Sequence, residues 1–301
     1  MSRAFGKVLL FGEHAVVHGV PAIAAGLPLP VIAEVTPSDD GVWHVDSPKW
    51  QLSEHGPDSR VVQALMALAR GLQLSEPMRV TLDASVPAGA GLGSSAAMAI
   101  AVGRALLTFY DKSAPDDALF DAAMASERVF HGNPSGLDHM AAMRGGVFRF
   151  LRGQPPHVEP MTLASPLQLV IAQVERGGDT GLLVGGVAQR RLRHPATFDH
   201  LLTSFRSVVD EATTALQNGR LADVGELMNI NHGLLSAIGV STASLDIATH
   251  AARSAGALGA KLTGAGGGGC MIALVDDSTR LPVESALRPV SQRQWTVVLP
   301  C

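Results

Sequence analysis

The sequence PAGAGLGSS, residues 87–95, is the stretch that decides the fold. Three glycines alternate with other residues, and two serines follow the last of them. Residues 79–84 before this loop alternate as in a β-strand, and the alanine-rich residues 94–110 after it have the length of a helix. Glycines let backbone N–H groups converge on an anion, and a helix N-terminus adds free donors and a positive dipole. The loop therefore predicts a cradle for nucleotide phosphates.

Two other phosphate-binding motifs do not describe this loop. A Walker A loop ends in Gly-Lys-Ser/Thr, and the only Gly-Lys pair of the chain is Gly6-Lys7. The dinucleotide fingerprint ends in glycine where this loop has Ser94. The plain alternative is a glycine-rich turn with Ser94 as an ordinary helix N-cap. The strand before the loop and the helix after it favour phosphate binding.

A second glycine run, GAGGGG at residues 264–269, matches the spelling of the dinucleotide fingerprint and raises a Rossmann oxidoreductase as a rival. The apolar residues 270–275 that follow are typical of a strand, so no helix N-terminus would face a pyrophosphate. We expect a tight hairpin beside a substrate here. A floppy turn is the alternative, although fixing so many glycines is costly unless something approaches the backbone closely.

The composition limits the partners of this 301-residue chain. With 23 basic and 27 acidic residues, its formal net charge of −4 provides no basic field for a nucleic acid. The two cysteines, Cys270 and Cys301, cannot form a disulfide framework, which fits a reducing cytoplasm. The chain contains no run of about 18 apolar residues, so no membrane span is predicted. Lys7 and two glycines interrupt the first apolar run, which is therefore not typical of a signal peptide.

The pattern of apolar residues predicts two domains, residues 1–160 and 161–301, with a compact core in each. The second half is dominated by helical patterns, whereas the first mixes strands and helices around the glycine loop. The expected strands are residues 8–11, 31–35, 79–84, 145–151, 167–174, 270–275 and 295–299, and the expected helices are residues 58–72, 94–110, 116–130, 183–193, 199–217, 220–238 and 243–257.

Glu127 lies on the apolar face of the predicted helix 116–130, three and four residues from Met124 and Ala123. A carboxylate there needs a partner. Mg²⁺ is one candidate, because it prefers oxygen ligands and takes only one or two of them from protein when phosphate is present. A salt bridge at the rim of the apolar stripe, with Arg128 or another base, is an equal alternative.

Each of the other charged residues has both an ordinary structural explanation and a functional one. Asp138 follows a turn-rich loop in which Gly136 frees the backbone, so its carboxylate is either aimed into a cleft or bonded locally. Lys7 begins an apolar strand, where its ammonium could simply reach water. Glu13 and His14 come directly after Gly12. Together with the phosphate loop, this set contains the parts of a kinase.

Four segments, read together, resemble the GHMP kinases, and within them the members whose acceptor is mevalonate. They are GKVLLFGEHAVVHG at residues 6–19, the loop at residues 87–97, ERVFHGNPSGLD at residues 127–138, and KLTGAGGGG at residues 261–269. The segments follow the order of the family and span nearly the whole chain. The first and third are specific, whereas the glycine loops alone would identify only the superfamily.

The resemblance implies an α/β (α+β) fold with an N-terminal ribosomal-protein-S5-like domain, a C-terminal ferredoxin-like domain, and ATP and acceptor in the cleft between them. It implies Mg²⁺ as cofactor and is compatible with a homodimer. Carried over by motif, Asp138 and Lys7 would be catalytic and Ser95 and Glu127 would hold Mg²⁺. The acceptor would be lined by Glu13, His14 and Thr180, and ATP would be bound by Ser85, Gly89, Ala90, Gly91, Leu92, Gly93, Ser94 and Ser95.

Two departures from the family pattern concern the acceptor side. Phe11 replaces a histidine that is common before Gly-Glu-His, and residues 177–181 lack the basic residues often found around the threonine. The second departure leaves open how the charge of the substrate or nucleotide is neutralised on that side. Other acceptors, namely phosphomevalonate, homoserine or a sugar, therefore remain alternatives, as does a non-catalytic homologue that keeps the ligand site.

Overall fold

The computed structural model describes residues 1–130, 135–153 and 155–301, which fall into two compact units. Unit 1 contains Met1–Lys7, Gly26–Ala88 and Leu92–Gly145, and unit 2 contains Val8–Ala25, Gly89–Gly91 and Gly146–Cys301. The chain passes from one unit to the other within strand β1 (Ser2–Phe11), within strand β2 (Ala22–Pro37) and within the glycine loop. A further crossing lies between Gly145 and Gly146, and Lys7, Glu13 and His14 lie close to the first crossing in the sequence.

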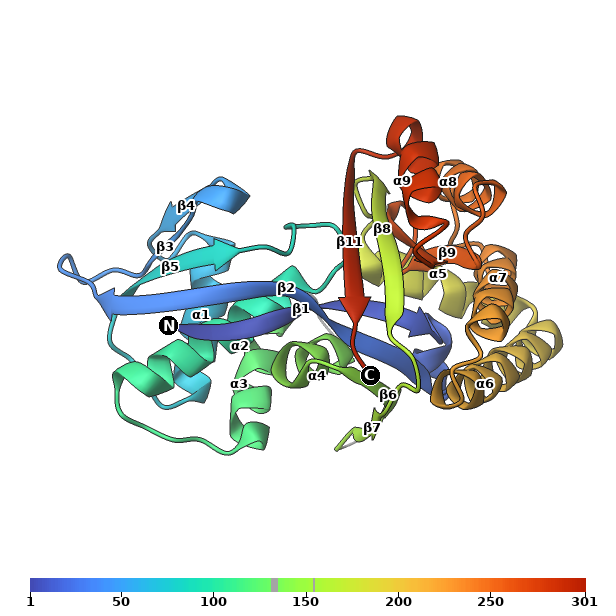
Figure 1. The fold of residues 1–301 in the computed structure, drawn as a ribbon. Helices are drawn as coiled ribbons and strands as arrows, with labels where there is room; N and C mark the ends of the chain where they lie inside the picture. Colours follow the sequence, from blue (N-terminus) through green and yellow to red (C-terminus); the bar gives the residue numbers. More distant parts are fainter. Residues whose placement is uncertain (131–134, 154) are drawn as a thin grey trace. The chain divides into compact units, whose positions relative to one another are not determined.

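Unit 1 combines a sheet with helices α1 to α4 and the short helix η2. The second half of β2 pairs with β5 (Met78–Ala84), which pairs in parallel with β3 (His44–Ser47), and β3 continues to β4 (Leu52–His55). Helix α1 packs on α2 and α3, and α2 also packs on α4 (Figure 1). Residues 96–102 of α2 are all buried, and four of these seven residues are alanines, whose small side chains permit close packing. The elements not yet bounded are η2 (Pro48–Trp50), α1 (Arg60–Gly71), α2 (Ser94–Phe109), α3 (Asp116–Phe130) and α4 (Leu137–Arg144).

Unit 2 contains a four-stranded antiparallel sheet of β8 (Leu167–Glu175), β9 (Gly259–Thr263), β10 (Gly269–Val275) and β11 (Arg293–Leu299). Its spatial order is β11-β8-β10-β9, with helices inserted after β8 and after β10. In order of sequence this is 4-1-3-2, the arrangement of a ferredoxin-like domain. The predicted ferredoxin-like fold is therefore confirmed.

The helices of unit 2 cover this sheet, and α8 and α9 lie beside each other (Figure 1). The core joins alternate residues of the strands, such as Val170 and Met271, to Leu245 of α8 and Val283 of α9. The first half of β2 pairs with β6, which pairs with β7. The remaining elements are η1 (Ala15–His18), β6 (Val147–Leu151), β7 (His157–Met161), α5 (Thr180–Arg193), α6 (Pro195–Gln217), α7 (Leu221–Ala237), α8 (Ala243–Ser254), α9 (Arg280–Leu287) and η3 (Arg288–Val290).

Helix α7 meets strand β9 through two glycines. A Cβ atom at Gly225 would overlap Leu258 O, and one at Gly259 would overlap Gly225 O. The backbones of helix and strand therefore touch with no side chain between them. This close approach fixes α7 on β9, and it requires glycine at both positions for steric reasons rather than for backbone conformation.

Replacing Gly225 with alanine is expected to lower the free energy of unfolding by roughly 1–3 kcal/mol, because the added methyl group has no space against Leu258. Gly233→Ala is the matched control on the same helix, since a Cβ there meets nothing within 4 Å. That control should be neutral or up to about 1 kcal/mol stabilising, through helix propensity. Urea unfolding of both variants measures the difference, and equal effects would contradict the assigned contact.

Most expected elements are present, and some were missed. Helix α3 has the predicted bounds, and the expected hairpin at the second glycine run is confirmed, because β9 and β10 pair antiparallel on either side of it. Strand β10 follows this run directly, so the Rossmann reading is wrong. Strands β3, β4, β7 and β9 and helices α4 and α9 were not predicted. The proposed end of α3 at residues 132–134 lies outside the described residues.

Candidate active site

The glycine loop has the backbone conformation expected of an anion cradle. Gly89, Gly91 and Gly93 have φ values of 68°, 78° and 75°, in the region that favours glycine. Gly93 is the N-cap of α2, and it has no side chain that could satisfy the first N–H groups of the helix. The start of α2 therefore presents backbone donors and the positive end of the helix dipole to a ligand.

In unit 1, the end of this loop is fixed to strand β1. The backbone N–H of Lys7 donates to Leu92 O at 2.8 Å. A Cβ atom at Gly93 would lie 3.0 Å from the Cβ of Lys7, so glycine permits the close approach. These contacts place the stem of the Lys7 side chain against the last glycine of the loop, immediately before α2.

The two predicted catalytic residues lie together in unit 1. Lys7 Nζ is 3.2 Å from Asp138 Oδ1, and the exposed fractions of the side chains are 7% for Lys7 and 37% for Asp138. Asp138 was expected in a turn-rich loop, but it is the second residue of helix α4. The helix starts after Gly136, whose φ of 81° turns the chain into it. A carboxylate on a helix is held more firmly than one on a loop, which suits a group that must meet a substrate at a set position.

Ser95 and Glu127 also come together. Ser95 Oγ, in the first turn of α2, donates to Glu127 Oε1 on α3 at 3.1 Å. His139 Nε2 lies 3.9 Å from Glu127 Oε2 and is buried beneath it. Burial raises the pKa of Glu127 to about 7, with a further rise from Asp138, while Ser95 and Lys7 act in the opposite direction.

These residues fit Mg²⁺. A hydroxyl and a carboxylate are the hard oxygen ligands that Mg²⁺ prefers, and a nearby cation would favour the ionised form of a buried carboxylate whose pKa is raised. Among the described residues, no group of three or more His, Cys, Asp or Glu side chains is placed to hold a metal. One hydroxyl and one carboxylate suit an ion that takes most of its other ligands from phosphate and water.

Glu13 and His14, which were predicted to line the acceptor, lie in unit 2 at the turn between β1 and η1. The Glu13 side chain is fully buried, with one carboxylate oxygen paired with Lys261 Nζ and the other accepting from Asn231 Nδ2 at 3.1 Å. Lys261 is itself fully buried and also donates to Leu262 O at 2.7 Å. Burial lowers the pKa of Lys261, and the facing Glu13 raises it. Glu13 therefore points into the interior of unit 2.

His14 has a strained backbone and a defined tautomer. Its φ is 59° and its ψ is −44°, an unusual conformation for a residue other than glycine. Its Nε2 lies 2.7 Å from Ala265 O, which accepts, so Nε2 carries the proton. Burial lowers the pKa of His14, which keeps the ring neutral near pH 7. Nδ1 is then a buried acceptor with no hydrogen-bond partner in the described part of the chain.

The two remaining predicted residues lie at the surface. Ser85 is the first residue after β5, and its N–H donates to Pro30 O at 2.8 Å while its side chain is exposed. Thr180 is the exposed first residue of α5, a helix whose N-cap is Asp179. The structure therefore defines the backbone position of both residues.

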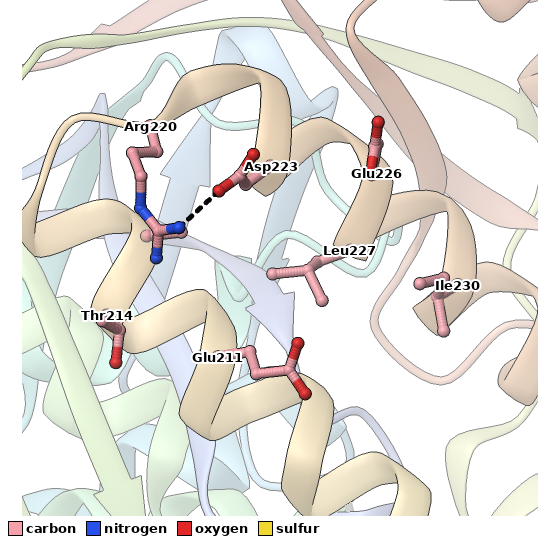
Figure 2. A pocket seen from close by; sticks show the side chains of 8 residues that line it. Glu211, Thr214, Arg220, Asp223, Glu226, Leu227 and Ile230 are labelled. Carbon is pink, nitrogen blue, oxygen red and sulfur yellow. Dashed lines mark ion pairs between the residues drawn. The ribbon is translucent and has the colours of Figure 1, made fainter.

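A separate surface pocket of about 310 Å³ in unit 2 contains none of these residues. It lies between α6 and α7, and Arg220 points toward Asp223, with which it pairs at 2.7 Å (Figure 2). The other charged residues of its lining are Glu211 and Glu226. Three carboxylates against one arginine repel phosphate, so this pocket does not suit a nucleotide.

Sequence reasoning missed the partners of Glu13 and the position of His139. Lys261 stood within the quoted glycine segment, yet its charge inside a strand of buried residues was not used. A lysine flanked by Ala260 and Leu262 was a signal for a buried partner. Asn231 gave no comparable signal, because one amide on a long helix is ordinary.

The comparisons with known proteins agree with this geometry. Residues 59–146 match the GHMP kinases N terminal domain, and residues 212–289 match the GHMP kinases C terminal domain. The chain belongs to the GHMP kinases and is an ATP-dependent kinase that acts on an alcohol. It is similar to the mevalonate kinase of Methanothermobacter thermautotrophicus, with 37% identity over 278 residues that cover 90% of this chain and 89% of that protein.

Two further relatives bear the same name. The mevalonate kinase of Pyrococcus abyssi is 33% identical over 304 residues, which cover 93% of this chain and 90% of that protein. The crystal structure of L. major mevalonate kinase in complex with R-mevalonate superposes with a TM-score of 0.91 at 30% identity, covering 99% of this chain and 95% of that one. Separately, none of the helices in the described ranges has the length and apolar character needed to span a bilayer.

Proposed function

We propose that this protein transfers the γ-phosphoryl group of ATP to the C5 hydroxyl of mevalonate, giving 5-phosphomevalonate and ADP. The observation that carries the proposal is the Lys7–Asp138 pair beside the glycine loop, with Nζ and Oδ1 3.2 Å apart. The choice of acceptor rests on relatives of one-third identity that are named mevalonate kinases, and on the residues 6–19 that resemble them.

In this proposal, the chain contributes mainly position and charge. The transition state of phosphoryl transfer is loose, so little basicity is needed early in the reaction. As the acceptor oxygen bonds to the γ-phosphorus, the bond from that phosphorus to the β,γ-bridging oxygen breaks and the hydroxyl proton passes to Asp138. Lys7 steadies the Asp138 carboxylate and the charge on the transferring group.

The remaining residues of the site would bind ATP, the metal ion and the acceptor. Ser85 and the backbone of residues 89–94 would hold ATP, and Ser95 and Glu127 would hold Mg²⁺, which neutralises charge on the phosphate oxygens when it is bound. His14 and Thr180 would recognise the acceptor, with Glu13 beside His14 in the same turn. The homodimer and the cytoplasmic location stay predictions from the sequence.

ADP release with MgATP across mevalonate, phosphomevalonate, homoserine and galactose tests the acceptor. We expect turnover with mevalonate at least about a hundredfold faster than with the others, because a site built for particular polar groups discriminates strongly against acceptors that lack them. Asp138→Ala is the control for contaminating kinases. Turnover with another acceptor but not with mevalonate would reassign the substrate, and no turnover with any of them would favour a non-catalytic homologue.

A further inference from the structure

The buried environment of Glu13 implies a role different from direct contact with a substrate. Its carboxylate is fully buried and both oxygens accept hydrogen bonds, one from Lys261 and one from Asn231. Because the Glu13 side chain has no exposed surface, an acceptor molecule at the protein surface does not touch it. Whatever Glu13 contributes to the acceptor side must therefore pass through the backbone of its own turn.

We propose that Lys261 and Asn231 are positioning residues that hold the buried Glu13 carboxylate, and that Glu13 thereby fixes the turn that presents His14 to the acceptor. The proposal rests on the proposed function, since it assigns to His14 the recognition of the acceptor. We call Glu13, Lys261 and Asn231 the carboxylate clamp.

Strand β9 is placed to hold this turn. Gly259, Lys261 and Thr263 alternate along the strand and so point to one face of it. Gly259 touches Gly225 of α7, and Lys261 pairs with Glu13. Thr263 Oγ1 donates to Leu9 O and accepts from Leu9 N, both at 3.0 Å. One face of β9 therefore binds the chain before the turn and the turn itself.

The next residues of the hairpin continue the same contact. Ala265 O accepts from His14 Nε2 at 2.7 Å, so the ring is oriented by the loop that begins where β9 ends. His14 keeps a φ of 59°, a conformation that persists in a protein only when the surroundings enforce it. Gly12 has a φ of 87°, and a Cβ there would lie 2.5 Å from Pro21 O. The turn therefore packs closely against Pro21 at Gly12, and hydrogen bonds hold it at Glu13 and His14.

The clamp requires a carboxylate in particular. Lys261 Nζ and Asn231 Nδ2 are both donors, and an ionised carboxylate offers two acceptor oxygens, one for each. A glutamine at this position would supply only one acceptor and would face the second donor with its own NH₂ group. Removing Lys261 alone would instead leave a buried negative charge with only Asn231 beside it.

A double-mutant cycle tests the clamp. Lys261→Met should raise the KM for mevalonate about tenfold or more and lower the urea midpoint, while the KM for ATP stays within about twofold. Glu13→Gln should raise the KM for mevalonate similarly. The variant that carries both substitutions should have a KM for mevalonate no higher than that of the worse single variant, because both act on one structure.

Asn231→Ala and Asn229→Ala form a matched pair on helix α7. Asn231 donates to Glu13, whereas Asn229 Oδ1 accepts from Ala260 N at 3.0 Å and does not contact the clamp. We expect a several-fold higher KM for mevalonate in Asn231→Ala and an unchanged one in Asn229→Ala, with comparable losses of stability. If Lys261→Met does not fold, this pair and the comparison of Glu13→Gln with the double variant carry the test.

The outcomes separate the clamp from the proposed function. Wild-type turnover of mevalonate combined with additive effects of Lys261→Met and Glu13→Gln would overturn the clamp, as would an equal rise of KM in Asn229→Ala. A uniform change of kcat and both KM values in Lys261→Met would also overturn it. Absence of wild-type turnover with mevalonate would instead overturn the proposed function. Non-additive KM effects with an unaffected Asn229→Ala support the clamp.

Discussion

Replacing Asp138 with alanine is expected to lower kcat by about a thousandfold or more while the affinity for MgATP changes by no more than about twofold. The carboxylate lies 3.2 Å from Lys7 and is 37% exposed, so it is both paired and accessible to a hydroxyl group. In the proposed mechanism, removing the Asp138 carboxylate takes away the proton acceptor and the group that orients the nucleophile. The glycine loop is held by the backbone contact of Lys7 with Leu92, which the substitution leaves in place.

A control substitution separates this effect from damage to a helix start. Asp117 is the second residue of α3, as Asp138 is of α4, and its carboxylate accepts from Ala118 N at 2.9 Å. Asp117→Ala should lower stability slightly and leave kcat within about twofold. Steady-state ADP release and equilibrium binding of MgATP measure the two quantities. Near-normal turnover in Asp138→Ala would refute the catalytic assignment.

Replacing Glu127 with glutamine is expected to raise the Mg²⁺ concentration for half-maximal rate by about tenfold or more, because Glu127 is proposed to hold the metal and the substitution removes its charge. The same substitution should stabilise the metal-free protein above pH 7. Burial raises the pKa of Glu127 from 4.5 to about 7, so the ionised carboxylate opposes folding as pH rises through that range. The pKa thus rises by about 2.5, which limits the expected stabilisation to about 3 kcal/mol.

Asp121→Asn on the same helix is the control for the loss of a negative charge, since Asp121 is exposed. It should leave the Mg²⁺ dependence of the rate unchanged. It should change the free energy of unfolding by no more than about 0.5 kcal/mol. Magnesium titrations of the initial rate, and urea unfolding at pH 8 without metal, give the two readouts. An unchanged Mg²⁺ requirement in Glu127→Gln would favour a purely structural ion pair for this residue.

The elements with strong local signals could be predicted from the sequence. Helix α3 has acidic residues in its first turn and a clear apolar face, and the glycine loop lies between a regular strand and an alanine-rich helix. Strand β9 was missed because all five of its residues are buried, including a lysine, so it shows neither alternation nor an apolar run. Helix α4 was missed because its eight residues have almost no amphipathic pattern.

Some contacts of the site could likewise be predicted from the sequence, and others could not. The pairs Lys7–Asp138 and Ser95–Glu127 join residues that family resemblance had already grouped, and the structure places them within hydrogen-bonding distance. The clamp joins residues more than 200 positions apart, and no local pattern links Glu13 to Asn231 or Lys261. Such contacts are decided by packing of the sheet and helices rather than by propensity.

The contact between Gly225 and Gly259 has a consequence for the precision of this site. Atoms of two backbones have no rotamers, so the spacing between α7 and β9 is set by van der Waals radii alone and has no alternative state. Asn231 stands six residues further along α7, about 9 Å along the helix axis, and Lys261 stands two residues further along β9. The contact between the two glycines thus fixes α7 relative to β9. It thereby also fixes the positions of Asn231 and Lys261, the two donors to Glu13.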